Sequence, residues 1–509
     1  MTSCPINSTH LLLAPIILFY APAALWLFLY GINNYYMIYL FLRTVKRESL
    51  RNSEFLAKFW LTNSDTLPKV TTQLPIYNEK NVAERLINAV INIQYPKELH
   101  EIQVLDDSHD ETRDIVVALV KKYKDLGYNV KHITREKRTG FKAGALNTGL
   151  EIAEGEFLAI FDADFLPDED FLYKTIPFFY ETKKVALVQT RWGYINRNYS
   201  LLTIVQSIGI DGHFIIEQGA RTWNGFYMNF NGTAGVWRKE AILDAGGWHY
   251  DTLTEDLDLS YRAQLKGWKT KFISDVVTPS EIPITVNAYK SQQHRWAKGS
   301  IQTARKILPH VFQSHDTLIK KIQAFIHLSQ YMVHPMMIII ALLSYPLVFL
   351  LKSINRLSVS FMVEILWGFI FLSTFAPLIL YMISQKTHHK DWLKRCIFIP
   401  TVIIIGCGIA INNTKAVAEA LLNVKSDFIR TPKYGVIKRD QNTVIKDYAL
   451  TKNLNPVSEI LFGIYCCAGF IQYVVNKEYI FGYFLLVCTL GFFYIGTFSF
   501  LENVKRKKI

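Results

Sequence analysis

The long polar middle of this chain, from about Arg43 to Phe325, contains no cysteine. All six cysteines lie near the N-terminus or in apolar segments, where they are typical small residues of membrane helices. A disulfide framework and a thiolate zinc site are therefore excluded from the middle, which fits a reducing compartment. The N-terminus also lacks a basic leader with a small-residue cleavage site. Its apolar run, Leu11–Leu42, is interpreted as a retained membrane anchor.

Size and composition indicate at least two regions. A chain of 509 residues is too long for one compact core, and its 50% apolar content suggests that part of it lies in lipid. The formal charge of +13 comes from 56 basic and 43 acidic residues. That charge fits nucleic acid, anionic lipid or phosphorylated substrates equally well, so it does not choose between them.

Four further apolar stretches have about the length that a helix needs to cross the hydrocarbon layer, roughly 20 residues. They are Ala324–Leu351, Val359–Ser384, Val457–Val475 and Tyr479–Leu501. A fifth stretch, Cys396–Ile411, is shorter and is followed by polar residues and the amphipathic Ala416–Val424. We expect the segment 396–424 to re-enter the membrane or to lie at its surface.

Basic residues predict which side of the membrane the middle occupies. They follow the first apolar run, precede the second and close the chain, namely Arg43, Lys46, Arg47, Arg51, Lys320, Lys321 and Lys505–Lys508. The positive-inside rule then places the middle and the C-terminal tail in the cytosol, with an even number of crossings between them. Lys352 and Arg356, in the one short loop that this topology places outside, argue against it.

The polar middle alternates short apolar runs with helical patterns. The expected strands are Lys69–Leu74, Ile102–Leu105, Val130–Thr134, Phe157–Phe161 and Ala186–Gln189, and the expected helices are Asn81–Ile93, Thr112–Leu126 and Lys142–Ala153. This alternation predicts a parallel α/β sheet with a site beyond the carboxyl ends of its strands. The predicted organisation is an anchor (1–42), an α/β domain (43–300), an interfacial amphipathic helix (301–323), and membrane helices (324–509) with a cytosolic loop near 425–456.

Acidic residues close two of the predicted strands. Asp162 and Asp164 follow Phe157–Phe161, and Asp106 and Asp107 close the strand at Ile102–Leu105. The twofold period of a strand aims Asp162 and Asp164 to one side, and two carboxylates held so close need a cation. A hard, oxygen-liganded ion that bridges to phosphate is the usual one. A turn signal is the alternative for an isolated Asp-x-Asp.

Three other motifs carry candidate chemistry. The segment 138–147 sets glycines and Lys142 at a helix start, which suits a diphosphate, although a helix cap with a solvated lysine fits equally. Glu255 and Asp256 open an amphipathic helix, where Asp256 is either an N-cap or a general base. Gln292, Arg295 and Trp296 form the third motif. The guanidinium of Arg295 could bind phosphate and the indole of Trp296 could stack on a sugar, or the two could be a structural pair.

The order of these motifs resembles the processive inverting glycosyltransferases of family 2, which include cellulose, hyaluronan and chitin synthases. The strings at 230–238 and 265–269 are most similar to the cellulose-synthase-like A group, which makes β-mannan and glucomannan, and to its bacterial relatives. The resemblance covers about Thr71–Trp296. It implies a Rossmann-like GT-A domain in the cytosol, flanked by transmembrane α-helices.

The resemblance also implies a role for each matching residue. The Pro75–Glu79 segment, including Tyr77, and Asp107 at the Asp106-Asp107 pair hold the nucleoside, and Lys142 meets the diphosphate. Asp162 lies near the nucleotide, Asp164 binds Mg²⁺ or Mn²⁺, and Asp256 is the general base, with Glu255 beside it as the next candidate. Gln292, Arg295 and Trp296 grip the acceptor end and the donor phosphates. The segment 428–433 resembles the gating loop of cellulose synthase, with Arg430 in place of a valine.

The function expected from this resemblance is transfer of a hexose from UDP-glucose or GDP-mannose to a growing β-linked polysaccharide, processively and coupled to export. The implied partners are the nucleotide-sugar donor, the polysaccharide and the lipid bilayer, with no nucleic acid. The plasma membrane of a bacterium is expected rather than the Golgi. A non-processive transferase acting on a lipid or lipid-linked acceptor shares every donor-site motif and remains the alternative. A channel or scaffold with an inactive domain is disfavoured because Asp164 and Asp256 are present.

Overall fold

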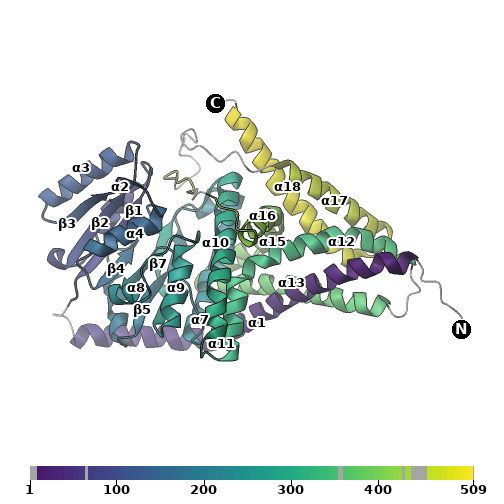
Figure 1. Cartoon of the computed structure of the whole chain (residues 1–509), viewed down its shortest axis with the longest axis horizontal. Helices are drawn as coiled ribbons and strands as arrows, with labels where there is room; N and C mark the ends of the chain where they lie inside the picture. The colour runs from purple at the N-terminus through teal and green to yellow at the C-terminus, as the bar shows by residue number, and fades with distance from the viewer. Residues whose placement is uncertain (1–7, 63–66, 354–358, 427–429, 437–455, 508–509) are drawn as a thin grey trace.

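The structure, a computed structural model, describes residues 8–62, 67–353, 359–426, 430–436 and 456–507. An α/β domain lies beside a group of long helices, as Figure 1 shows. The predicted strands and helices of the domain are confirmed to within a few residues. They are β1 (Val70–Ile76), β2 (His100–Asp106), β3 (Asn129–Thr134), β4 (Phe157–Ile160) and β5 (Val185–Tyr194), with α2 (Ala83–Ile91), α3 (Thr112–Asp125) and α4 (Phe141–Ile152).

The five predicted strands run parallel to one another, but the sheet as a whole is mixed, because the unpredicted strand β6 runs antiparallel to both of its neighbours. The seven strands of the sheet run in the order β3-β2-β1-β4-β6-β5-β7. The sequence analysis missed β6 (Gly235–Arg238), which lies antiparallel between β4 and β5, and β7 (Lys269–Ser280), which is parallel to β5. β6 has only four residues and follows a glycine-rich loop, so its apolar run is too short to read as a strand.

The neighbouring parallel strands β2, β1 and β4 place the acidic strand ends together. β1 pairs with β2 on one side and β4 on the other, so that Ile76 lies opposite Asp106 and Gln73 opposite Ile160. The residues that follow these three strands therefore share one edge of the sheet. Helices cover both faces, since apolar side chains of α2 and α3 pack on one face and those of α4 on the other.

The other helices of the domain are short. They are α5 (Phe171–Thr175), α6 (Leu201–Asp211), α7 (Gln218–Trp223), α8 (Lys239–Asp244) and α9 (Glu255–Leu265), with a π-helical turn, η4 (Gly212–Glu217), between α6 and α7. Short 3-10 turns lie at Lys97–Leu99 (η1), Ile176–Tyr180 (η2), Arg197–Tyr199 (η3) and Gln330–Met332 (η5).

The first helix, α1 (Ser8–Thr62), continues well beyond the predicted anchor at 1–42. It runs on beneath the α/β domain, as the purple helix in Figure 1 shows. Its extension is stabilised by aromatic packing, since the ring of Phe55 lies 5.4 Å from that of Phe178 and the ring of Phe59 lies 5.4 Å from that of Tyr180. The basic residues after position 42 thus belong to an amphipathic continuation of the same helix.

Five helices of the described residues are long and apolar enough to cross a membrane. They comprise part of α1 together with the spans Gln330–Val348, Gly368–His388, Pro456–Val475 and Gly482–Val504. These spans correspond to the predicted anchor and the four predicted stretches. The last four spans belong to α12 (Val333–Ser353), α13 (Val359–His388), α17 (Pro456–Val475) and α18 (Tyr479–Lys507). The span in α12 begins in η5.

The segment 396–424 forms a broken pair of helices. The run Trp392–Gly408, which contains α14 (Trp392–Cys396) and α15 (Ile399–Gly408), bends by 45° against α16 (Ala410–Leu421). Such a bend fits a re-entrant loop or one broken span, so the number of crossings here stays a prediction. Close packing holds the pair, because a Cβ on Gly408 would lie 2.2 Å from the carbonyl oxygen of Gly491 in α18.

The stretch predicted as one interfacial helix, 301–323, belongs to two helices. α10 (Val286–Gln313) ends within this stretch, and α11 (Leu318–Leu328) begins after Thr317, whose hydroxyl accepts a hydrogen bond from the Lys320 N–H. One face of the end of α10 is buried, because Ile307 and Val311 pack against Tyr227 and Tyr261 of the domain. Apolar side chains are exposed on both helices, since Phe312 of α10 is 51% exposed and Leu318 of α11 is 73% exposed.

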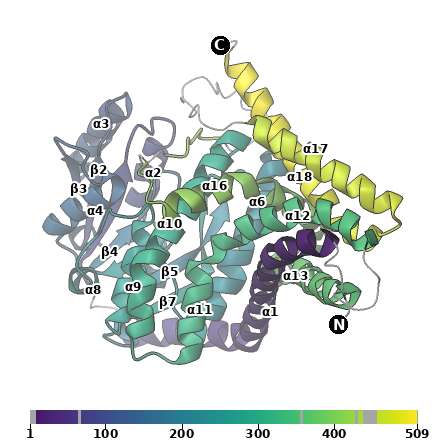
Figure 2. The ribbon, with the colours of Figure 1, turned by 45° about the vertical axis from the view of Figure 1, so that its right-hand side comes forward.

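Several predicted features lie outside the described residues. They are Cys4, Arg356, Phe428, most of the expected loop at 425–456 and the end of the basic tail. Figure 2 shows how α16 and α10 lie together between the domain and the helices α12, α17 and α18.

Candidate active site

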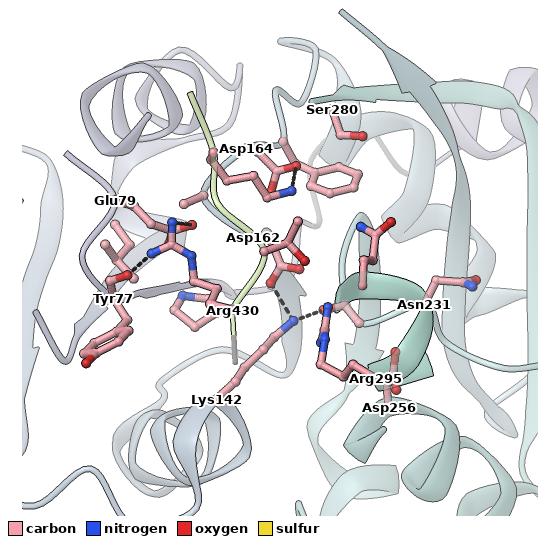
Figure 3. Close-up of a pocket in the computed structure, with 18 of the residues that line it drawn as sticks. Tyr77, Glu79, Lys142, Asp162, Asp164, Asn231, Asp256, Ser280, Arg295 and Arg430 are labelled. Carbon is pink, nitrogen blue, oxygen red and sulfur yellow. Dashed lines mark hydrogen bonds and ion pairs between the residues drawn. The ribbon is translucent and has the colours of Figure 1, made fainter. Parts of the chain in front are cut away.

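A pocket opens at the carboxyl edge of the parallel strands, and the predicted site residues meet in it. It is partly open to solvent and is lined by residues from both the domain and the segment 430–436. Figure 3 shows side chains from the sheet, α4, α9, α10 and the segment 430–436 converging on this space. The predicted residues that line it are Pro75, Tyr77, Glu79, Asp107, Lys142, Asp162, Asp164, Glu255, Asp256, Gln292, Arg295 and Trp296.

Asp106 is the one predicted site residue that does not line the pocket. Its side chain is fully buried, with Oδ2 lying 2.9 Å from His132 Nε2 and Oδ1 accepting a hydrogen bond from the Ser108 N–H. Burial alone would raise the pKa of Asp106, but the hydrogen bonds from His132 and Ser108 outweigh it and lower the pKa. Asp106 therefore fixes the turn after β2, and its neighbour Asp107 reaches the pocket.

The side of the pocket near Tyr77 is aromatic and basic. The Arg138 guanidinium lies over the ring of Tyr77, 3.4 Å from its centroid. Asp107 forms a two-point ion pair with Arg135, at 3.0 Å from Nε and 2.5 Å from Nη2. A planar stack and fixed carboxylate oxygens are groups that bind a base and a ribose. Arg138 begins the motif at 138–147, and its stacking on Tyr77 was not predicted from the sequence.

Lys142 lies between the two acidic groups of the site. It extends from the first turn of α4, and its Nζ lies 2.5 Å from Asp162 Oδ1 and 4.0 Å from Glu255 Oε1. Burial would lower the pKa of Lys142, but the charges of Asp162, Glu255 and Asp256 raise it overall, so the ammonium stays charged. Lys142 also donates to the Gly232 carbonyl at 2.8 Å.

Asp164 carries the predicted metal site, and its surroundings fit a cation. Oδ2 of Asp164 accepts from the ammonium of Lys433 at 2.6 Å, so a positive charge already lies against this carboxylate. Asp162, two residues away on the same strand end, holds the second cation, Lys142. A pair of carboxylates that lines one pocket offers the hard oxygen ligands that Mg²⁺ and Mn²⁺ prefer.

The segment 430–436 covers this side of the pocket. Arg430 pairs with Glu79 at 3.1 Å and donates hydrogen bonds to the carbonyls of Tyr77 and Asn78. Glu281, at the end of β7, accepts hydrogen bonds from the N–H groups of Tyr434 at 2.8 Å and Gly435 at 2.9 Å. The sequence analysis noted Arg430 only as a departure from the gating motif, and it missed Glu281 and the contact of Lys433 with Asp164.

Asp256 is the candidate base and lies in the first turn of α9. The N-cap of that helix is Thr254, so the N-cap role considered for Asp256 does not hold. Its Oδ1 accepts from the Leu257 N–H at 2.8 Å, while its Oδ2 lies 3.1 Å from where a Cβ on Gly232 would stand. Gly232 has φ +80° and admits this close approach. Burial and the neighbouring charge of Glu255 raise the pKa of Asp256 to about 7.

Gln292, Arg295 and Trp296 project into the pocket from α10. Figure 3 shows Arg295 beside Asp256, on the opposite side from Tyr77 and Arg430. Within the described residues, the buried Oε1 of Gln292 finds no hydrogen-bond partner. Because an unpaired buried acceptor costs about 1 to 3 kcal/mol, this oxygen is suited to a hydroxyl of a bound molecule.

Membrane-type helices hold α10 in place. Glu502 of α18 accepts hydrogen bonds from the first N–H groups of α10, at Val286 (2.7 Å) and Asn287 (2.9 Å). Lys290 forms a fully buried ion pair with Glu459 of α17 at 2.5 Å. The helix that carries Gln292, Arg295 and Trp296 is thus tied to α17 and α18, two of the helices that are long and apolar enough to cross a membrane.

Comparison with known proteins finds a matching family and several relatives. Residues 68–299 match the family described as Glycosyltransferase like family 2. The chain is 33% identical to glucomannan 4-beta-mannosyltransferase 1 of Cyamopsis tetragonoloba over 474 residues, covering 89% of this chain and 86% of that protein. It is also 33% identical to a probable glucomannan 4-beta-mannosyltransferase 2 of Oryza sativa subsp. japonica over 450 residues, covering 84% and 75%.

Among solved structures, the chain is similar to a mannosyltransferase from Pyrobaculum calidifontis, at 18% identity and a TM-score of 0.46. That match covers 78% of this chain and 100% of the other. The relatives named from curated proteins are of plant origin and give no support to the expectation of bacterial relatives or of a bacterial membrane.

Proposed function

This chain belongs to the cellulose-synthase-like group of glycosyltransferase family 2, and we propose that it transfers a hexose from a nucleotide-diphosphate sugar to a growing β-linked polysaccharide. Mannose in a 1,4-β linkage is the first candidate product, since the relatives are named as 4-beta-mannosyltransferases. GDP-mannose and UDP-glucose are both donors to test. The proposal rests mainly on one observation: Lys142 and Asp256 face each other across one pocket, with the loop at Gly232 between them.

The donor would lie along the carboxyl edge of the sheet. Its base would stack in the region of Tyr77 and Arg138, and its diphosphate would approach Lys142 and the Asp162 and Asp164 carboxylates. Lys142 supplies a fixed positive charge to the leaving diphosphate. A Mg²⁺ or Mn²⁺ ion held by Asp164 and Asp162 would supply further charge neutralisation there.

The acceptor would come from the opposite side, past Gln292, Arg295 and Trp296. Asp256 takes the proton from the acceptor hydroxyl as the hydroxyl oxygen attacks the anomeric carbon. The bond from that carbon to the diphosphate oxygen breaks in the same displacement, so an α-linked donor gives a β-linked product. The raised pKa of Asp256 suits a group that must accept a proton near neutral pH.

We further propose that the enzyme is embedded in the membrane, with its pocket in the cytosol, and that it elongates one chain repeatedly and passes it outward. The proposal is supported by the contacts of α10 with α17 and α18, which bring the acceptor side of the pocket next to the spanning candidates. The alternative is a single addition to a lipid or lipid-linked acceptor.

A donor screen on the purified protein in detergent or nanodiscs tests the proposal. The protein is incubated with Mn²⁺ and each labelled nucleotide sugar, and the product is analysed for linkage and length. Polymer with 1,4-β-mannosyl linkages is the expected result. A lipid-soluble product of one added sugar would favour the alternative, and transfer from neither donor would contradict the proposed function.

A further inference from the structure

The π-helical turn η4 joins the catalytic domain to the membrane helices. Gly212 begins it, and a Cβ there would lie 2.8 Å from side-chain atoms of Leu380 and Tyr381 in α13. Ile215 and Ile216 are buried with Phe41 of α1. A π turn interrupts regular helical hydrogen bonding and is often found at functional sites. Its polar residues therefore need an explanation beyond packing.

A chain of hydrogen bonds leads from this turn into the active-site pocket. Glu217 Oε2 lies 3.0 Å from His213 Nδ1, and His213 Nε2 lies 3.1 Å from Asn231 Nδ2. On the other side of the same amide, Gln218 Nε2 donates to Asn231 Oδ1 at 2.5 Å. His213, Glu217 and Gln218 all come from η4 and the start of α7, so one short segment holds the Asn231 amide at both ends.

The hydrogen bonds assign the proton positions. Burial would raise the pKa of Glu217, but the hydrogen bond from His213 opposes it and the pKa is lowered overall, so Glu217 is a carboxylate. It accepts from His213 Nδ1–H, which leaves Nε2 of the neutral imidazole as an acceptor for the Asn231 N–H. This tautomer fixes the rotation of the amide, because a flipped amide would set its donors against those of Gln218.

Asn231 lies where donor and acceptor sides of the pocket meet. Its neighbour Gly232 contacts both Lys142 and Asp256, and the hydroxyl of the next residue, Thr233, accepts from the Asp162 N–H at 2.9 Å. Figure 3 shows Asn231 on the same side of the pocket as Asp256 and Arg295. In the described part of the chain, the bonds to His213 and Gln218 leave the amide one N–H and one oxygen lone pair for a ligand.

We propose that His213 and Glu217 are positioning residues that orient the Asn231 amide toward a hydroxyl of the acceptor sugar, so that the membrane-docked turn η4 sets the geometry of the attacking group. The inference rests on the proposed transferase function. A hydroxyl that both donates and accepts matches the free N–H and the free lone pair of the amide. A rotated amide would displace that hydroxyl relative to Asp256, and misplacement of a reacting group by about 1 Å costs about 100-fold in rate.

Three variants of the full-length protein test the assignment, each with nucleotide affinity and transfer kinetics measured. His213→Phe keeps a planar ring but removes both hydrogen bonds, and His213→Gln restores an acceptor near the position of Nε2. Glu217→Gln removes the charge that fixes the tautomer. We expect His213→Phe to lower transfer about 10- to 100-fold and to raise the acceptor KM. His213→Gln should recover most of the transfer, Glu217→Gln should be intermediate, and nucleotide affinity should be unchanged in all three.

A purely structural role for His213 predicts a different result. His213→Gln would then be as impaired as His213→Phe, or nucleotide affinity would fall together with transfer, and either outcome overturns the inference. Transfer by His213→Phe at the wild-type rate overturns it as well. If His213→Phe does not fold, wild-type transfer by Glu217→Gln has the same consequence. Failure of the proposed function itself is distinguishable, because the wild-type protein would then transfer from neither donor.

Discussion

The ammonium of Lys433 lies 2.6 Å from the Asp164 carboxylate, although the two residues are 269 positions apart in the chain. Lys433 also donates to the Glu281 carbonyl, and Arg430 three residues earlier pairs with Glu79. The segment 430–436 thus places a positive charge against the carboxylate that we expect to bind the metal. A divalent ion that binds Oδ2 of Asp164 would compete with this ammonium for the same oxygen.

Removal of the Lys433 charge should tighten metal binding. In Lys433→Met, Mn²⁺ no longer competes with the ammonium, and its affinity in the absence of nucleotide should rise about 3- to 10-fold, as expected for loss of a partly buried ion pair. Electron paramagnetic resonance of Mn²⁺ measures this directly. Lys415→Met, at a lysine that is 60% exposed, is the matched control. Equal Mn²⁺ affinity in Lys433→Met and wild type would mean that the two cations do not share a site.

Removal of the metal should abolish transfer. Excess chelator should reduce the rate by about 100-fold or more, since the charge on the leaving diphosphate would lose a main stabilising group. Added Mn²⁺ or Mg²⁺ should restore the rate in the wild type but not in Asp164→Ala. The measurement is sugar transfer before and after dialysis against each ion. Full activity in excess chelator would remove the metal from the account.

The pH profile should report the environment of Asp256. The base acts when deprotonated, so transfer is lost as the pH falls through its raised pKa, near 7. After burial, the charge of Glu255 is the largest cause that raises this pKa. Glu255→Gln should therefore shift the acid limb of the kcat profile to lower pH, while Glu240→Gln on the exposed surface should not. An acid limb that stays in place in Glu255→Gln would assign the limb to another group.

The buried pair of Lys290 and Glu459 should be costly to break. Both side chains are at most 2% exposed. Lys290→Met leaves an unpaired carboxylate and should destabilise the protein by about 3 to 5 kcal/mol. Replacing both residues with methionine should recover most of that loss, because no charge is left buried. Thermal unfolding in detergent compares the single and double variants. If Lys290→Met and the double variant were equally stable, the unpaired Glu459 carboxylate would cost nothing and the site would be solvated.

The sequence predicted those parts of the site that lie within short motifs. Asp162 and Asp164 directly follow an apolar strand, and Lys142 lies at the start of a helix. The hydrophobic period of the sequence and the place of these residues in it were therefore enough to predict them. Glu255 and Asp256 were found in the same way. The family resemblance then joined these motifs into one pocket, which the structure contains.

Contacts between distant segments could not be predicted. Lys433 and Glu281 have no local signal, because their roles depend on how the segment 430–436 lies over the sheet. His213 lies in a helical run of apolar residues, where residue spacing alone predicts a buried structural role. The antiparallel β6 was missed because its partners β4 and β5 lie far from it in sequence and its own run is short.

The most direct test of the proposed mechanism is turnover and nucleotide affinity measured together in Asp256→Asn. The amide keeps an oxygen that can accept the Leu257 N–H, so α9 should remain intact and the nucleotide should bind as in wild type. It cannot take a proton, so transfer should fall by about 100- to 10,000-fold. Near-normal turnover in Asp256→Asn would contradict the account and move the role of base to Glu255.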